Sequence, residues 1–396
     1  MKKIKLPSLK GEMGAVIVLA LSAVVFVIAL HMIYAEDFMH GVADLFSVYG
    51  DQMVEFDTAT INEVLSEDLQ QDEVVAEPLM GNQQLAVTIT SGRYKGEKME
   101  AYNAYGVLSG VPLKANENVT LIIKTHDDGS RTATVYELYR LPTLAVFLLI
   151  FVIVVALVGR LTGIKSLVGL VFTTVCLFFV LIPLLLKGLP AIPTTFFMCT
   201  YIALVCFVIL GGVHRKSMCA FLGTVSGMFL AMVFALAAQR FARIDGLRLE
   251  DAEAMYQMGM YEGVYVDISG LLVSSIIICS LGAVMDVAMS MASSLEEIHA
   301  ANPALTQKEL FKSGMNVGRD AAGTMTNTLI LAFIGSEFTL MVYFFARSLT
   351  FNHLFSTAFV ALETISGLSS SVGTILAIPL TALISSTLIT RGKSGK

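Results

Sequence analysis

Charged residues are scarce in this chain of 396 amino acids. Asp, Glu, Lys and Arg together make up 15% of the residues, whereas hydrophobic residues make up 55%, and the mean hydropathy is +0.74. This composition is too apolar for a soluble domain of this size. It excludes the soluble globular class and identifies an integral membrane protein.

Cysteines are also few, and none lies between Ala35 and Arg140. All five fall inside or at the edges of apolar segments: Cys176, Cys199, Cys206, Cys219 and Cys279. This distribution excludes a disulfide framework and a Cys-x-x-Cys metal site. The sequence also lacks a phosphate-binding loop, a nucleophile elbow, a His-Glu-x-x-His helix and a Gly-x-Gly-Asp segment. We therefore expect neither an enzyme nor a cofactor or metal.

Long apolar runs are abundant, and each membrane span needs roughly 20 predominantly apolar residues. The sequence offers eight candidates: Gly14 to Tyr34, Thr143 to Gly159, Ser166 to Leu186, Thr194 to Val213, Ser217 to Ala238, Ile268 to Ala288, Ala321 to Phe345 and Leu368 to Ile389. The fold class is therefore a mainly α-helical, polytopic membrane bundle.

The orientation follows from Lys and Arg, because short loops rich in these residues stay in the cytoplasm. With eight spans and the N-terminus inside, the inside segments hold 14 basic residues and the short outside loops hold five. This predicts that both termini lie inside. The expected parts are a basic N-terminus and anchor (1–34), an acidic outer segment (35–80), a small β domain (81–140), a seven-span membrane domain (141–390) and a cytoplasmic tail (391–396).

The first apolar run has two interpretations. Lys2 to Lys10 resembles the basic start of a signal peptide, and Ala35 is a small residue after the apolar stretch. However, the run is longer than an ordinary signal-peptide core, which favours an uncleaved anchor.

The expected outer region, from Ala35 to Arg140, carries most of the negative charge. Between Ala35 and Arg140 there are 18 acidic and 7 basic residues. A solvated surface explains this acidity, and a vestibule that attracts cations is the alternative.

The outer region, residues 35–140, divides into two parts. Asp37 to Glu77 has apolar residues at helical spacing, which predicts one or two helices followed by an acidic linker. After it, "QQLAVTIT", "EKMEAYN", "NVTLIIKT" and "RTATVYELY" are typical of short strands, and "HDDGS" at 126–130 is typical of a hairpin turn. These strands predict a small, OB-like β-barrel. Basic and aromatic residues at 91–105 are candidates to bind an acidic ligand, and the alternative is that the aromatic side chains fill the barrel core.

Small residues mark helix contacts in the membrane half. Gly223, Gly227, Ala231 and Ala235 recur every four residues, which predicts a ridge where another helix approaches closely. In the last span, Pro379 removes a helix hydrogen bond, so we expect a broken or re-entrant helix there.

Acidic residues in spans six to eight are the main functional candidates. Asp286 lies near the cytoplasmic end of span six, about 28 Å along the helix from Asp267, so these two acids cannot form a pair. The methionines around Asp286 are expected to be packing residues rather than metal ligands.

The segment "GRDAAGTMTNTLILAFIGSE" (318–337) combines polar and apolar residues. On a regular helix, Asp320, Thr324, Asn327 and Thr328 share one face, and Arg319 is expected to pair with Asp286 at the same depth. This face serves either helix packing or function. Before this segment, Thr306 and Glu309 have capping-box spacing and predict the start of a short cytoplasmic helix.

Glu337 does not fall on the face of Asp320. An acid in hydrocarbon costs about 2.5 to 3.5 kcal/mol on insertion scales, so this side chain is expected to face the bundle or a wet cavity as a functional acid, and the alternative is that it snorkels outward. Gly335 and Ser336 directly precede it and predict a break in span seven. Glu363, shortly before the last predicted span, is a second acidic candidate for a transport path.

Three blocks resemble the YibE/F family of bacterial multi-pass membrane proteins: "GLLVSSIIICSLGAVMDVAMSMASSLEEI" (270–298), "ELFKSGMNVGRDAAGTMTNTLILAFIGSE" (309–337) and "GTILAIPLTALIS" (373–385). The resemblance implies a helical protein of the bacterial cell membrane and of transport type, with an extracytoplasmic ectodomain. It implies no settled substrate or catalytic residue. One departure is that Glu363 is followed by Thr364, Ile365 and Ser366, where the family pattern has a basic residue.

Two functional hypotheses remain. The first is a secondary transporter or permease that moves a cation or small solute along Asp286, Asp320, Asn327, Glu337 and Glu363. The second is a membrane sensor or assembly protein whose ectodomain binds a ligand or partner. Both hypotheses place the protein in the lipid bilayer. The expected partners are a second copy of the chain or a protein bound by the ectodomain, and nucleic acid is not expected as a partner.

Overall fold

The computed structural model describes scattered helical residues between 19 and 30, and then residues 54–71, 78–106, 110–126, 129–244, Met255, 266–348 and 350–391. The chain forms two compact units. One unit is Glu36–Leu157, and the other combines Met1–Ala35 with Val158–Lys396. Most of the first expected span, Gly14 to Tyr34, lies outside the described residues.

The first unit is built on a closed β-barrel. Its strands are β1 (Val54–Gln71), β2 (Pro78–Ile89), β3 (Lys98–Tyr105), β4 (Asn118–Thr125) and β5 (Arg131–Leu138). The order around the barrel is β1-β2-β3-β5-β4, and only the β3–β5 pair among these is parallel. This is the arrangement of an OB-fold barrel, as the sequence predicts.

The barrel interior follows from strand alternation. Side chains two residues apart point to the same face of a strand, so Leu85, Val87 and Ile89 of β2 all enter the core. Leu121 and Ile123 do the same from β4 and are almost completely buried. The hairpin between β4 and β5 closes with a hydrogen bond from the His126 amide to the Ser130 carbonyl at 2.9 Å.

The structure corrects the expectation for residues 35–80. Residues 54–71, expected as helix and linker, form the longest strand, β1. Ala59 and Ile61 of this strand are fully buried in the core. Two register shifts, between Ile61 and Glu63 and between Val64 and Ser66, interrupt the alternation that would have revealed the strand. Residues 35–53 lie outside the described part.

The second unit consists of long helices. They are α3 (Leu141–Cys176, which begins in the first unit), the π-helical turn η1 (Leu177–Leu181), α4 (Ile182–Leu186), α5 (Ala191–Gly211), α6 (Arg215–Ala242), α8 (Ile268–Ala301), α9 (Gln307–Ser336), α10 (Phe338–Ala346), α11 (Phe351–Ser356) and α12 (Ala358–Arg391).

Five stretches among the described residues are long and apolar enough to cross a membrane, or six when α9 and α10 count as one bent span. The first stretch, Leu141–Leu186, contains two helices that meet at Arg160, whose φ of 49° and ψ of −133° are not helical. The expected spans Thr143 to Gly159 and Ser166 to Leu186 lie on either side of this residue.

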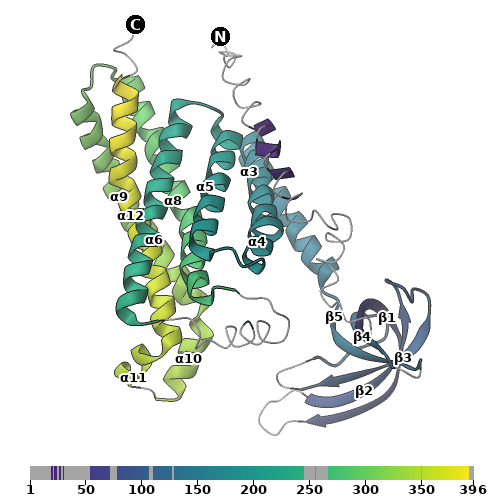
Figure 1. Cartoon of the computed structure of the whole chain (residues 1–396). Helices are drawn as coiled ribbons and strands as arrows, with labels where there is room; N and C mark the ends of the chain where they lie inside the picture. Colours follow the sequence, from purple (N-terminus) through teal and green to yellow (C-terminus); the bar gives the residue numbers. More distant parts are fainter. Residues whose placement is uncertain are drawn as a thin grey trace. The chain divides into compact units, whose positions relative to one another are not determined.

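Helices α6, α8 and α12 pack against one another, with α5 beside α6 and α8, and α9 beside α12 (Figure 1). Their shared core is apolar and includes Phe207 of α5, Met228 of α6, and Ile277 and Ala288 of α8. Helix α9 therefore lies alongside α12, and α10 and α11 connect the end of α9 to the start of α12.

Helix α9 starts where the sequence predicts and then continues farther. The Thr306 hydroxyl accepts a hydrogen bond from the Glu309 amide at 3.3 Å, and the Thr306 amide donates to the Glu309 carboxylate at 2.9 Å, which confirms the capping box. However, the short helix and the seventh span are one helix, Gln307–Ser336. Gly314 and Gly318 do not interrupt it because they pack against Leu295 and Ile378.

Helix α12 also differs from the expectation of a broken or re-entrant last span. It is continuous from Ala358 to Arg391, with Pro379 inside it. Neighbouring helices tolerate proline when packing holds the backbone in place. Here Ala377 and Ile378, which directly precede Pro379, are both buried against other helices.

Candidate functional site

The site begins with a break in the membrane helices at Glu337. Helix α9 ends at Ser336, α10 begins at Phe338, and the two helices are bent by 61°. Glu337 lies at the junction with φ −99° and ψ 12°, while its amide still donates to the Phe333 carbonyl at 3.3 Å. A Cβ atom built on Gly335 would meet nothing within 4 Å, so no packing holds the helix straight there. The break therefore occurs where the Gly-Ser-Glu sequence predicts it.

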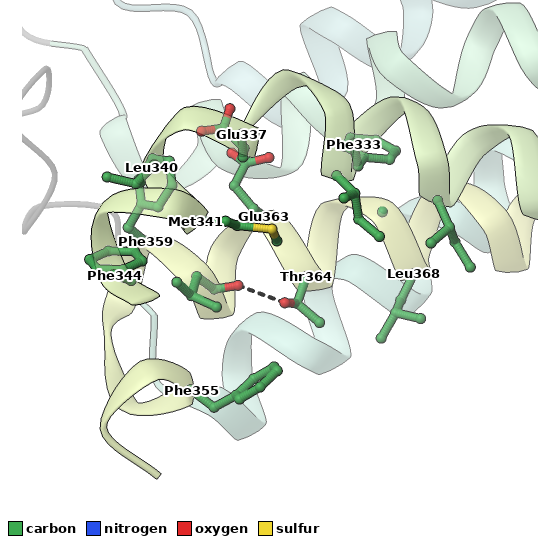
Figure 2. Close-up of a pocket in the computed structure, with 14 residues that line it drawn as sticks. Phe333, Glu337, Leu340, Met341, Phe344, Phe355, Phe359, Glu363, Thr364 and Leu368 are labelled. Atoms are coloured by element: carbon green, nitrogen blue, oxygen red, sulfur yellow. Dashed lines mark hydrogen bonds between the residues drawn. The ribbon is translucent and has the colours of Figure 1, made fainter. Parts of the chain in front are cut away.

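A second carboxylate meets this junction from another helix. Glu363 lies in the second turn of α12, and its charge interacts with that of Glu337. Figure 2 shows the Glu363 side chain extending from α12 toward the α9–α10 junction. Both side chains are half-buried, and neither forms an ion pair or accepts a hydrogen bond within the part of the chain that the structure describes.

The two carboxylates line one pocket of about 270 Å³. The pocket lies among α9, α10, α11 and α12 (Figure 2), and its lining residues are Ile330, Phe333, Ile334, Glu337, Leu340, Met341, Phe344, Phe355, Phe359, Val360, Glu363, Thr364, Gly367 and Leu368.

The pocket is otherwise apolar. The Thr364 hydroxyl donates to the Val360 carbonyl at 2.7 Å, so its hydrogen is already used by the helix backbone. Four lining residues are phenylalanines. Glu337 and Glu363 are thus two like charges close together in apolar surroundings, and a bound cation or proton would relieve their repulsion.

A residue that the sequence did not single out as functional interacts with one member of this pair, Glu363. Cys279 of α8 is the exposed one of the five cysteines, all of which are free thiols. Its side chain interacts electrostatically with Glu363 and lies beside Ser370 of α12. No spacing in the sequence connects these residues, because they come from helices that meet only in the folded bundle.

The other candidate acids are not part of this pocket. Asp286 of α8 is exposed, and so are Arg319 and Asp320 of α9. Among the described residues, Arg319 and Asp286 form no ion pair, so the expected pairing is wrong. Each of these side chains lies on the side of its helix that faces away from the packed bundle. Equal depth along two helices therefore does not bring Arg319 within reach of Asp286.

The exposed face of α9 that carries Asp320 also carries Thr324, Asn327 and Thr328. The Thr324 hydroxyl donates to the Ala321 carbonyl at 3.0 Å, and the Thr328 hydroxyl donates to the Thr324 carbonyl at 2.9 Å. The packed side of α9 lies elsewhere and includes the buried residues Leu310, Gly314 and Gly318. The polar face is therefore open in the single chain.

The small-residue ridge on α6 contacts α12. Gly223 lies against Thr381, Gly227 lies against Ala377, and Ala231 lies against Gly373. These contacts support the helix that carries Glu363 and do not supply polar groups to the pocket.

The β-barrel contains a separate candidate pocket of about 300 Å³, lined by Asn103, Ala104, Gly110, Val111, Leu113, Val135, Tyr136, Glu137 and Leu138. It lies where β3 and β5 separate, since their pairing covers just Ala101 with Ala133 and Tyr102 with Thr134.

A buried amide network supports this second pocket. The Gln83 side chain donates to the Leu113 carbonyl at 3.0 Å and accepts from the Leu113 amide at 3.0 Å. Asn103 donates to Gln83 at 2.9 Å and to the Val111 carbonyl at 3.1 Å. The network holds segment 110–113 against the barrel.

Strand β1 carries a buried carboxylate, Asp57, on the same inward face as Ala59 and Ile61. Asp57 is 5% exposed, and one of its oxygens has no hydrogen-bond partner. Burial raises the pKa of the Asp57 carboxyl, a hydrogen bond from Ser91 lowers it, and the charge of Glu55 raises it.

Comparison with known proteins identifies the family of the chain. The family model described as "YibE/F-like protein" matches residues 147–391, which include every helix that lines the membrane pocket. No curated protein and no solved structure matches the chain. Because the match covers more than half of the sequence, the chain belongs to the YibE/F-like family.

Proposed function

We propose that the protein is a secondary transporter or permease-like membrane protein that moves a cation or small solute, with Glu337 and Glu363 as its binding groups. The supporting observation is that these two carboxylates, from different helices, meet in a pocket at a helix break. Helices that break at a binding site are typical of transporters, because the break frees polar groups inside the membrane. The proposal involves no enzymatic step, metal or cofactor.

The proposed topology has eight spans in a bacterial cell membrane, with both termini inside. Eight spans result if Gly14 to Tyr34 is an anchor, if the two helices of Leu141–Leu186 each cross, and if α9 and α10 form one bent span. The distribution of Lys and Arg supports this orientation. The barrel would then be extracytoplasmic, and the break at Glu337, about 45 Å along α9 from Gln307, would lie toward the outer leaflet.

Exposed charged residues on α8 and α9 favour a second copy of the chain as a binding partner. Asp286, Arg319 and Asp320 carry charges of both signs on open helix faces, near the expected cytoplasmic ends of spans six and seven. Charges that face lipid are costly, so a neighbouring subunit that covers them would stabilise the assembly.

The test is flux through the purified full-length chain in proteoliposomes. Influx of inorganic and organic cations is measured for the wild type, Glu337→Gln and Glu363→Gln. Glu297→Gln is the matched control, because Glu297 is an exposed acid on α8 outside the pocket. We expect both pocket variants to lose flux while the control and the elution profile of every variant remain unchanged.

The second candidate function is a non-transporting sensor or assembly protein. The observation in its favour is the barrel pocket between β3 and β5, which could receive a ligand or partner segment. Absence of flux for every tested cation, combined with ligand binding that requires Asn103, would establish this alternative and reject the transporter.

A further inference from the structure

The size of the membrane pocket constrains its ligand. Its volume of about 270 Å³ corresponds to roughly nine water molecules at their share of liquid volume. A dehydrated Ca²⁺ or Mg²⁺ ion instead needs about six to eight oxygen ligands at about 2.0–2.6 Å. The pocket offers two carboxylates, and no group of three or more His, Cys, Asp or Glu residues suited to a metal occurs within the described residues.

The lining indicates a ligand that carries its own apolar surface. Apart from the two carboxylates and Thr364, the lining residues are aliphatic, aromatic or glycine. Phe333, Phe344 and Phe359 present aromatic side chains beside the carboxylates (Figure 2). Aromatic rings attract organic cations through their negative faces, and this attraction strengthens when the cation is desolvated.

We infer that the pocket binds an amphiphilic organic cation, such as a quaternary ammonium or amine with an aromatic or aliphatic body. Its charged centre lies between Glu337 and Glu363, and its body contacts the phenylalanines and aliphatic side chains. This inference rests on the proposed function for the role of the pocket, and it adds the substrate class.

The test is equilibrium binding to the full-length chain in nanodiscs made from phosphatidylglycerol. The probe is radiolabelled benzyltrimethylammonium, and its neutral counterpart is neopentylbenzene, which replaces the nitrogen with carbon. We expect the cation to bind and the neutral molecule to bind much more weakly. Glu337→Gln and Glu363→Gln should each weaken cation binding by at least about tenfold, or about 1.4 kcal/mol.

Three further variants separate local chemistry from misfolding. Glu363→Asp keeps the charge and should retain part of the affinity. Phe344→Leu should weaken cation binding several-fold, whereas Phe345→Leu should not, because Phe345 is 77% exposed and outside the pocket. Equal affinity for both probes, or unchanged affinity in both glutamine variants, would overturn the inference.

Three further outcomes show which part of the proposal fails. Cation binding without flux would reject transport and keep the ligand class. Flux of an inorganic cation that the quaternary ammonium does not inhibit would keep transport and reject the ligand class. Loss of probe affinity when phosphatidylethanolamine is added to the nanodiscs would assign the pocket to a lipid ammonium group and overturn the free organic cation.

Discussion

Gly227 of α6 lies so close to Ala377 of α12 that a Cβ atom built on the glycine would sit 2.8 Å from the Cβ atom of the alanine. The same Cβ would lie 2.7 Å from Val284 of α8. Real Cβ atoms do not approach other atoms this closely, so one missing side chain allows all three central helices to meet.

The first prediction is therefore that Gly227→Ala destabilises the bundle. Extra volume in a packed core costs about 1–3 kcal/mol because neighbouring helices must separate. Thermal unfolding in detergent should show a lower midpoint. Gly282→Ala is the control, since a Cβ atom there would meet nothing within 4 Å. Equal midpoints for the two variants would contradict the close approach.

The central helices were predictable because each is a single apolar run. The expected spans Thr194 to Val213 and Ser217 to Ala238 differ from α5 and α6 by a few residues at each end. The β4 strand matches its predicted residues, since alternation there is uninterrupted. Strand β1 was missed because register shifts break its alternation and exposed acids such as Glu63 and Glu67 resemble a linker.

The candidate site was predictable residue by residue but not as a pair. Glu337 is conspicuous in an apolar run after Gly335 and Ser336, and its break is confirmed. Its proximity to Glu363 depends on how α10 and α11 return the chain to α12, which no local pattern specifies. The pairing of Arg319 with Asp286 failed for the same reason, because equal depth does not determine the distance between two helices.

The second prediction concerns the amide network in the barrel. Gln83→Leu removes the acceptor of the Leu113 amide, which lies in a buried position. An unsatisfied buried donor costs about 1–3 kcal/mol, so segment 110–113 should open more often. Hydrogen exchange of the Leu113 amide in the full-length chain should accelerate. The neighbouring substitution Gln84→Leu should leave it unchanged, because Gln84 faces outward and bonds to the exposed Ser66.

The third prediction is a pH dependence at Asp57. Its folded-state pKa lies above the ordinary value of 3.8, mainly because of burial. Between these two values the folded state holds a proton that the unfolded state has released, so stability from this group is fully present below 3.8 and is lost as the pH rises through the folded pKa. Asp57→Asn should remove this loss and stabilise the barrel at neutral pH.

The measurement is hydrogen exchange of the β1 amides in the full-length chain between pH 4 and pH 7, corrected for intrinsic exchange rates. Wild-type protection should fall with rising pH relative to Asp57→Asn. Asp68→Asn is the control because Asp68 is exposed on the same strand. An identical pH slope in wild type and Asp57→Asn would show that the buried carboxyl does not contribute.

The fourth prediction tests whether the space beside the carboxylates is hydrated. Cys279 is exposed and interacts with Glu363, whereas Cys199 is completely buried. A small, membrane-impermeant thiol reagent should therefore label Cys279 in proteoliposomes, and Cys279→Ser should abolish that label. Cys199→Ser should not change it. The organic cation that we propose as the ligand should slow labelling, because it would occupy the space beside Glu363. Failure of the reagent to reach Cys279 from either side of the membrane would mean that the space between Cys279 and Glu363 is dry, which would count against a water-accessible path to Glu363.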